Sequence, residues 1–167
     1  MKIVVIYFDY FPKSLQNRLK ENKIKAEFVK NDNLSLLKYE PDIVIISGSS
    51  KRILKDHDFP EIRKIINNSN IFVIGICFGF HLMVFFEGGK IIECEQHKKN
   101  EKISDNLILY FNHNDRIIKL PKQWKIMDEF EHFINIASNK NMIGYQFHPE
   151  KHQKSFNMFL LPFLFRK

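Results

Sequence analysis

Cysteine is scarce in this sequence, and long apolar runs are missing. The two cysteines, Cys77 and Cys94, are too few for a disulfide scaffold among 167 residues, and their spacing fits no common metal-binding motif. We therefore expect a reducing, cytoplasmic compartment and no metal or other cofactor. No apolar run reaches the roughly 18 residues that a membrane span needs, so no membrane partner is expected. The apolar start of the chain stops at Asp9 without a signal-peptide cleavage site, which predicts a buried strand.

Acidic residues are outnumbered, with 19 Asp and Glu against 26 Lys and Arg, for a net charge of +7. Nucleic-acid phosphates need clustered cations, whereas these cations are spread along the chain in short groups such as Lys98 and Lys99. The charge therefore predicts solvated surface, or a patch for an acidic protein partner, and no nucleic-acid site.

Linkers, repeats and low-complexity tracts are also missing, which predicts one domain over residues 1–167.

The first half of the chain alternates short apolar runs with amphipathic stretches. This alternation is typical of βαβ units, so the predicted fold is α/β, a three-layer sandwich with a mostly parallel central sheet flanked by helices. The predicted strands are residues 2–8, 25–29, 42–47 and 71–76, and the predicted helices are 12–23, 59–69 and 78–89.

The second half contains mostly β-like runs, which predict the far side of the same sheet with an antiparallel excursion. These runs are residues 90–94, 106–112, 116–120, 124–130, 132–138 and 142–147. The aromatic-rich stretch 153–165 predicts a helix packed on the sheet; a partner-binding surface is the alternative interpretation.

The segment "GICFG" places Cys77 between Gly75 and Gly79, at the end of a predicted strand and the start of a predicted helix. Sites in α/β proteins lie at the carboxyl ends of parallel strands. Glycines on both sides let the backbone turn sharply, as in a nucleophile elbow. Cys77 is therefore a candidate nucleophile, and a buried structural cysteine is the alternative.

The segment "GYQFHPE" carries His148 out of a predicted strand, with Pro149 and Glu150 directly after it. If the backbone stays extended, His148 and Glu150 lie on the same side. A catalytic cysteine needs a base, which His148 would supply, and that base needs a carboxylate to orient it, which Glu150 would supply.

His148 and His152 are four residues apart, but Pro149 argues against a helix there, so we expect no zinc site.

With these two segments, the chain resembles the class I glutamine amidotransferases and is most similar to the glutaminase subunit of GMP synthase. "IISGSS" (45–50) matches the loop that reads Ser-Gly-Gly-Pro in the family, and "FNHNDRIIKLP" (111–121) matches a substrate-binding loop. "EGGK" matches the glycine pair after the nucleophile helix. The resemblance implies a flavodoxin-like fold and a glutaminase that works through a Cys thioester.

The resemblance also implies roles for individual residues. Cys77, His148 and Glu150 would form the catalytic triad, and the backbone N–H groups of Ser49 and Phe78 would form the oxyanion hole. The expected substrate-binding residues are Gly48, His81, Asn114 and Asp115. His113 would shape the substrate-binding loop.

Three positions depart from the family pattern. His81 replaces a glutamine that contacts the substrate, Ser49 and Ser50 replace Gly-Pro, and Asn114 replaces a glycine. His81 could alternatively occupy the polar side of its helix. The intact Cys77, His148 and Glu150 and the three departures together leave three hypotheses open. The first is a glutaminase that hands ammonia from L-glutamine to a separate ATP pyrophosphatase-type synthetase chain. The second is a γ-glutamyl hydrolase or another Cys amidase, and the third is a glutaminase-like binding or regulatory protein.

Overall fold

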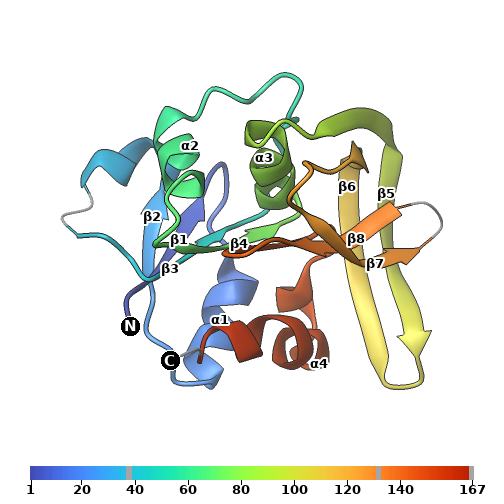
Figure 1. Ribbon diagram of the computed structural model, residues 1–167. Helices are drawn as coiled ribbons and strands as arrows, with labels where there is room; N and C mark the ends of the chain where they lie inside the picture. Colours follow the sequence, from blue (N-terminus) through green and yellow to red (C-terminus); the bar gives the residue numbers. More distant parts are fainter. Residues whose placement is uncertain (37–38, 131–132, 166–167) are drawn as a thin grey trace.

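The computed structural model describes residues 1–36, 39–130 and 133–165, and it contains a central sheet and a separate hairpin (Figure 1). Within these residues, the sheet has seven strands in the order β2-β1-β3-β4-β9-β8-β7. The sheet strands are β1 (Ile3–Tyr7), β2 (Glu27–Lys30), β3 (Ile43–Ile46), β4 (Phe72–Ile76), β7 (Lys125–Phe130), β8 (Phe133–Ser138) and β9 (Met142–Tyr145). The hairpin strands are β5 (Lys90–Ser104) and β6 (Leu107–Lys119).

The sheet is mostly parallel, as predicted. Strands β2, β1, β3, β4 and β9 run parallel to one another, and β8 and β7 add an antiparallel edge. Helices α2 (Pro60–Ile66) and α3 (Phe78–Phe86) cover one face, while α1 (Lys13–Glu21) and α4 (Gln153–Ser155) cover the other (Figure 1). The predicted three-layer α/β sandwich is confirmed. No helix in the described part of the chain is long and apolar enough to cross a membrane.

Two apolar cores lie on either side of the sheet because successive strand residues point to opposite faces. In β3, Val44 and Ile46 pack in the core under α2 and α3, whereas Ile43 and Ile45 pack in the core over α1. All four side chains are buried, which explains the continuous apolar run of this strand.

The β5–β6 hairpin corrects the prediction for residues 106–120. The sequence predicts two runs joined by a loop that contains His113, Asn114 and Asp115, but β6 continues unbroken through them. Buried residues alternate with more exposed ones along β6, and His113 and Asp115 occupy two of the buried positions. Because polar residues stand where a half-buried strand normally carries apolar ones, they hide the strand pattern in the sequence.

The C-terminal stretch packs on the sheet as predicted, but it is not one regular helix. α4 is followed by a π-helical turn (Phe156–Leu160) and a 3₁₀ turn (Leu161–Phe163); two more 3₁₀ segments are Asn31–Leu36 and Pro149–Lys151. Phe156, Leu160 and Leu164 are buried against the sheet at four-residue intervals. Pro162 lacks the N–H that a continuous helix would need at this point, so the helix cannot continue regularly.

The parallel arrangement gathers one end of several strands at one edge of the sheet. The carboxyl ends of β1, β3, β4 and β9 meet there, and they are followed by Asp9, Gly48, Cys77 and His148, respectively. Residues that are far apart in the sequence thereby become neighbours.

Candidate active site

Cys77 lies on a strained turn between β4 and α3. Its φ of 51° and ψ of −105° fall in a region that residues other than glycine rarely adopt. A Cβ at Gly79 would lie 2.2 Å from the carbonyl oxygen of Ile46, and a Cβ at Gly75 would lie 2.7 Å from the backbone nitrogen of Phe80. Glycine at both positions therefore lets α3 begin directly against the sheet. This geometry is that of a nucleophile elbow, as the sequence predicts.

The Cys77 side chain is buried, and its backbone and sulfur are both held by neighbouring strands. The Cys77 N–H donates to the carbonyl oxygen of Tyr145 at 2.7 Å, and the thiol lies 3.5 Å from the carbonyl oxygen of Asn112 on β6. The sulfur is thus placed between the parallel sheet and the hairpin.

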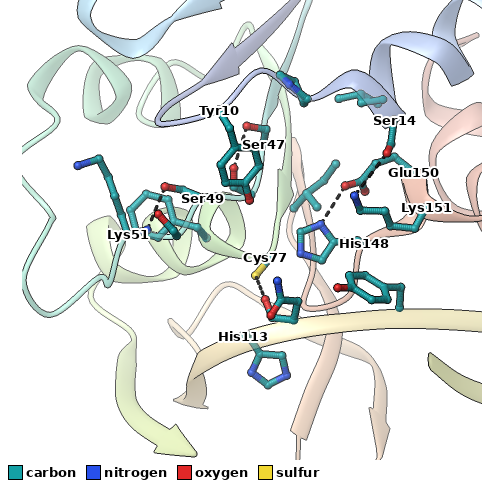
Figure 2. A pocket seen from close by; sticks show the side chains of 18 of the residues that line it. Tyr10, Ser14, Ser47, Ser49, Lys51, Cys77, His113, His148, Glu150 and Lys151 are labelled. Carbon is teal, nitrogen blue, oxygen red and sulfur yellow. Dashed lines mark hydrogen bonds and ion pairs between the residues drawn. The ribbon is translucent and has the colours of Figure 1, made fainter. Parts of the chain in front are cut away.

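His148 and Glu150 form a buried pair beside this sulfur. His148 Nδ1 lies 2.9 Å from Glu150 Oε1, and the His148 N–H donates to the Tyr110 carbonyl oxygen at 2.8 Å. Figure 2 shows the His148 ring between Cys77 and Glu150. The expectation of an extended backbone is wrong, because Pro149–Lys151 forms a 3₁₀ turn that brings the carboxylate back to the ring.

The charges of this pair stabilise each other. Burial would lower the pKa of His148, but the Glu150 charge and hydrogen bonds with Cys77 and Glu150 raise it to about 10. Burial would likewise raise the pKa of Glu150, whereas the facing charge of His148 and their hydrogen bond hold it below its ordinary value. The pair is therefore an imidazolium and a carboxylate at neutral pH.

Gly48 lies in direct contact with the His148 ring. A Cβ at Gly48 would lie only 2.7 Å from His148 Cε1, so a larger residue would push the loop and the ring apart. The next residue, Ser49, and the elbow residue Phe78 each have a backbone N–H that meets no acceptor among the described residues. Two unengaged N–H donors are what the oxyanion hole predicted from the sequence would need.

All nine site residues predicted from the sequence line one cavity of about 460 Å³. They are Gly48, Ser49, Cys77, Phe78, His81, Asn114, Asp115, His148 and Glu150. Sequence reasoning missed Tyr10 and Lys13, which line the same cavity just after β1 and could have been found from the strand-end rule. It also missed Tyr110, whose place depends on hairpin pairing and carries no local signal.

The Asp115 carboxylate is engaged by the loop that follows β3. Asp115 Oδ1 accepts two hydrogen bonds from the Arg52 guanidinium, at 2.7 and 2.9 Å, and Oδ2 accepts from the Ile53 N–H at 3.2 Å. The guanidinium also donates to the Asn114 carbonyl oxygen at 2.9 Å. These bonds fasten the loop to β6, so the Asp115 side chain and the Asn114 carbonyl are already occupied.

His81 is buried, and the alternative of a polar helix face is wrong. Every side chain from Phe78 to Val84 on α3 is buried. The His81 Nε2–H donates to the Gln146 side-chain oxygen at 2.9 Å. Burial lowers the pKa of His81 despite this hydrogen bond, so the imidazole is neutral at pH 7.

His113 forms part of the hairpin wall of the cavity. Its Nδ1–H donates to the Asp115 carbonyl oxygen at 3.0 Å. Burial, together with the neighbouring His81 and His97, lowers the pKa of His113 to about 3, so this ring is also neutral. In the described part of the chain, no group of three or more His, Cys, Asp or Glu residues is arranged to hold a metal ion.

Sequence relatives point to one family. The family profile described as Glutamine amidotransferase class-I matches residues 4–167. The chain is 27% identical to a protein named GMP synthase [glutamine-hydrolyzing] from Thermosipho melanesiensis, over 90% of this chain and 33% of that protein. It is 29% identical to the protein of the same name from Petrotoga mobilis, over 96% of this chain and 34% of that protein. The chain thus spans about one third of the length of these relatives.

Solved structures share the fold at lower identity. A putative GMP synthase subunit from Thermoplasma acidophilum superposes with a TM-score of 0.77 at 21% identity, over 95% of this chain and 90% of that one. A glutamine amidotransferase from Thermotoga maritima has a TM-score of 0.70 at 15% identity, over 97% and 82% of the two chains. With the family profile covering almost its whole length, this chain belongs to the class I glutamine amidotransferase family.

Proposed function

We propose that this protein hydrolyses the side-chain amide of L-glutamine through a thioester on Cys77. The observation that carries the proposal is the charged His148–Glu150 pair beside a strained cysteine elbow, inside a cavity of about 460 Å³. Glu150 orients the ring and stabilises its positive charge, and the ring stabilises the attacking thiolate.

In the first half of the proposed reaction, the Cys77 sulfur attacks the amide carbon and forms a tetrahedral oxyanion. The N–H groups of Ser49 and Phe78 donate to that oxyanion, and a single such donor contributes on the order of 3 kcal/mol to the barrier. His148 then gives its proton to the leaving nitrogen, and ammonia departs. The acyl group remains on the sulfur as a thioester.

In the second half, His148 takes a proton from a water molecule, and the resulting hydroxide attacks the thioester. The oxyanion forms at the same position, and its collapse releases glutamate and restores the Cys77 sulfur. The net reaction converts glutamine and water into glutamate and ammonia.

We propose that Gly48, His81 and the backbone of Asn114 and Asp115 contact the substrate, since all four line the cavity.

The proposed ammonia acceptor is a separate synthetase chain of the ATP pyrophosphatase type, with GMP synthase as the first candidate. The support is the name of the matched relatives, GMP synthase [glutamine-hydrolyzing], of which this chain spans about one third. A solved structure of similar fold is described as a GMP synthase subunit.

The test is release of ammonia from L-glutamine by the purified protein, alone and with candidate synthetase chains. We expect turnover by the unaltered protein and a loss of more than about 1000-fold in Cys77→Ser, which keeps the shape of the side chain. γ-Glutamyl peptides are measured in parallel, and a preference for them over glutamine would identify a γ-glutamyl hydrolase instead. If no ammonia appears under any condition while a thiol reagent still modifies Cys77, the protein is a binding or regulatory one.

A further inference from the structure

The loop that follows β3 is held almost entirely by side chains. Four consecutive N–H groups donate to polar side-chain oxygens: Ser50 to Asp9 at 2.9 Å, Lys51 to Ser49 at 3.1 Å, Arg52 to Asp56 at 3.0 Å and Ile53 to Asp115 at 3.2 Å. For the two residues before them, Gly48 and Ser49, the N–H meets no acceptor in the described part of the chain. The loop therefore has fixed neighbours on one side and unengaged donors on the other.

Asp9 accepts three hydrogen bonds at the start of the loop. Its Oδ1 accepts a hydrogen bond from the Ser49 hydroxyl at 2.7 Å, and its Oδ2 accepts hydrogen bonds from both the N–H and the hydroxyl of Ser50. Asp9 follows β1, which pairs with β3, so the carboxylate stands beside the start of the loop. One carboxylate thus binds two consecutive residues through three hydrogen bonds.

These contacts determine the backbone direction next to Ser49. The Ser49 side chain is bound to Asp9 on one side and accepts the Lys51 N–H on the other. Its rotamer is therefore locked, and the following Ser50 amide is held by Asp9. With the neighbouring Gly48 packed against the His148 ring, the Ser49 peptide is fixed at both ends.

We propose that Asp9 is a positioning residue that holds the Gly48–Ser49–Ser50 loop so that the Ser49 N–H remains available to the oxyanion. This inference rests on the proposed glutaminase function. Asp9 does not line the cavity, whereas Gly48, Ser49 and Ser50 do, so it acts through the loop and not on the substrate. The three hydrogen bonds also lower the pKa of Asp9 against the effect of its partial burial, so the carboxylate is charged at neutral pH.

The experiment compares Asp9→Ala and Asp9→Asn with Asp58→Ala, which removes an exposed aspartate from the same long connection after β3. Two quantities are measured: kcat and KM for ammonia release, and amide hydrogen exchange of residues 47–53. For Asp9→Ala we expect kcat to fall about 10- to 100-fold, less than the loss of a whole donor, with KM changed by less than about 3-fold. Exchange at Ser50 and Lys51 should accelerate, because the Ser50 N–H loses its acceptor and the Ser49 hydroxyl, which accepts from the Lys51 N–H, is no longer held by Asp9.

Asp9→Asn should fall between the unaltered protein and Asp9→Ala, because one amide oxygen can still accept from Ser50. Asp58→Ala should match the unaltered protein in both measurements. If Asp9→Ala keeps kcat within about 2-fold, or leaves the exchange of Ser50 and Lys51 unchanged, the inference is overturned. Should the unaltered protein release no ammonia, the proposed function fails, and unchanged exchange in Asp9→Ala would then overturn the positioning role separately.

Discussion

The two walls of the cavity are built in different ways. On one wall, the short buried strands β3, β4 and β9 end side by side, and they are followed by Gly48, Cys77 and His148, respectively. On the other wall, the long β5–β6 hairpin places polar side chains in the middle of a strand. The first wall is positioned by backbone topology, and the second by the register of a hairpin.

The two walls also have different roles in the proposed site. The strand-end wall carries Cys77, Phe78 and the His148–Glu150 pair, which would perform the chemistry. The hairpin wall holds the loop after β3 through Asp115 and lines the space for substrate. Changes in the first wall should therefore affect catalysis or folding directly, while changes in the hairpin should act through position.

The largest effect is expected for Glu150→Gln. The amide cannot stabilise the positive charge of His148, so the kcat for ammonia release should fall by about 1000-fold. KM should change little, because Glu150 orients His148 and is not proposed to bind substrate. The measurement is steady-state ammonia release, with a thermal unfolding curve to confirm that the variant is folded. A loss of less than about 10-fold would contradict the role of this pair.

The next effect is expected at the elbow, for Gly79→Ala. The added Cβ would lie 2.2 Å from the Ile46 carbonyl oxygen, so α3 must move away from β3 and the free energy of unfolding should fall by about 3 kcal/mol. Gly88→Ala is the matched control, since its φ of 84° strains an alanine but no atom lies within 4 Å of the added Cβ. The control should lose only about 1 kcal/mol. Urea unfolding of both variants measures the difference, and equal losses would show that α3 does not pack as described.

The hairpin wall is tested by Asp115→Ala. Removal of the carboxylate leaves Arg52 and the Ile53 N–H without their buried acceptor, so the free energy of unfolding should fall by about 2 kcal/mol. The combination with Arg52→Ala should cost less than the sum of the two single changes, because both remove the same bridge. Urea unfolding of the two single variants and the double variant gives a double-mutant cycle. If the two losses in the free energy of unfolding were strictly additive, Arg52 and Asp115 would not interact as described.

The pH dependence of stability provides another comparison. His148 has a folded pKa of about 10 against an ordinary value of 6.5, so its contribution is complete below pH 6.5 and is lost as pH rises through 10. In this window the free energy of unfolding should fall by up to about 1.4 kcal/mol per pH unit. Glu150→Gln should lose most of this component, because the charge and the hydrogen bond of Glu150 no longer raise the pKa of the buried ring and only its interaction with Cys77 still does. If the free energy of unfolding fell equally steeply with pH in the unaltered protein and in Glu150→Gln between pH 6.5 and 10, the charged pair would be contradicted.

The smallest effect is expected at the far end of the hairpin, for Ile108→Ser. The Ile108 side chain is 43% exposed and lies near the turn, away from Asp115 along the same strand. The free energy of unfolding should change by no more than about 0.5 kcal/mol, and kcat should be unchanged. A large loss of activity would show that the whole hairpin, and not only its part near Asp115, shapes the site.

The parallel strands and the elbow could be predicted from sequence because their signals are local. Runs of Val and Ile mark β3 and β4, and the glycines around Cys77 mark the turn between β4 and α3. The hairpin could not be predicted in full, because His113 and Asp115 interrupt its apolar pattern and their burial depends on β5 and the loop after β3. The same applies to Ser49 and Ser50, whose acceptor Asp9 is about 40 residues away.

The α/β class, the positions of β1, β3 and β4, the elbow at Cys77 and the closeness of His148 and Glu150 follow from the amino-acid sequence alone, although the 3₁₀ turn that brings the carboxylate to the ring does not. They depend on periodicity, glycine placement and short spacing, which act within a few residues. Three other features depend on the folded chain: β6 runs through Asp115, His81 is buried against Gln146, and Asp9 binds the loop after β3. Each of them joins segments that are distant along the chain or depends on strand register, and local sequence carries no information on such contacts.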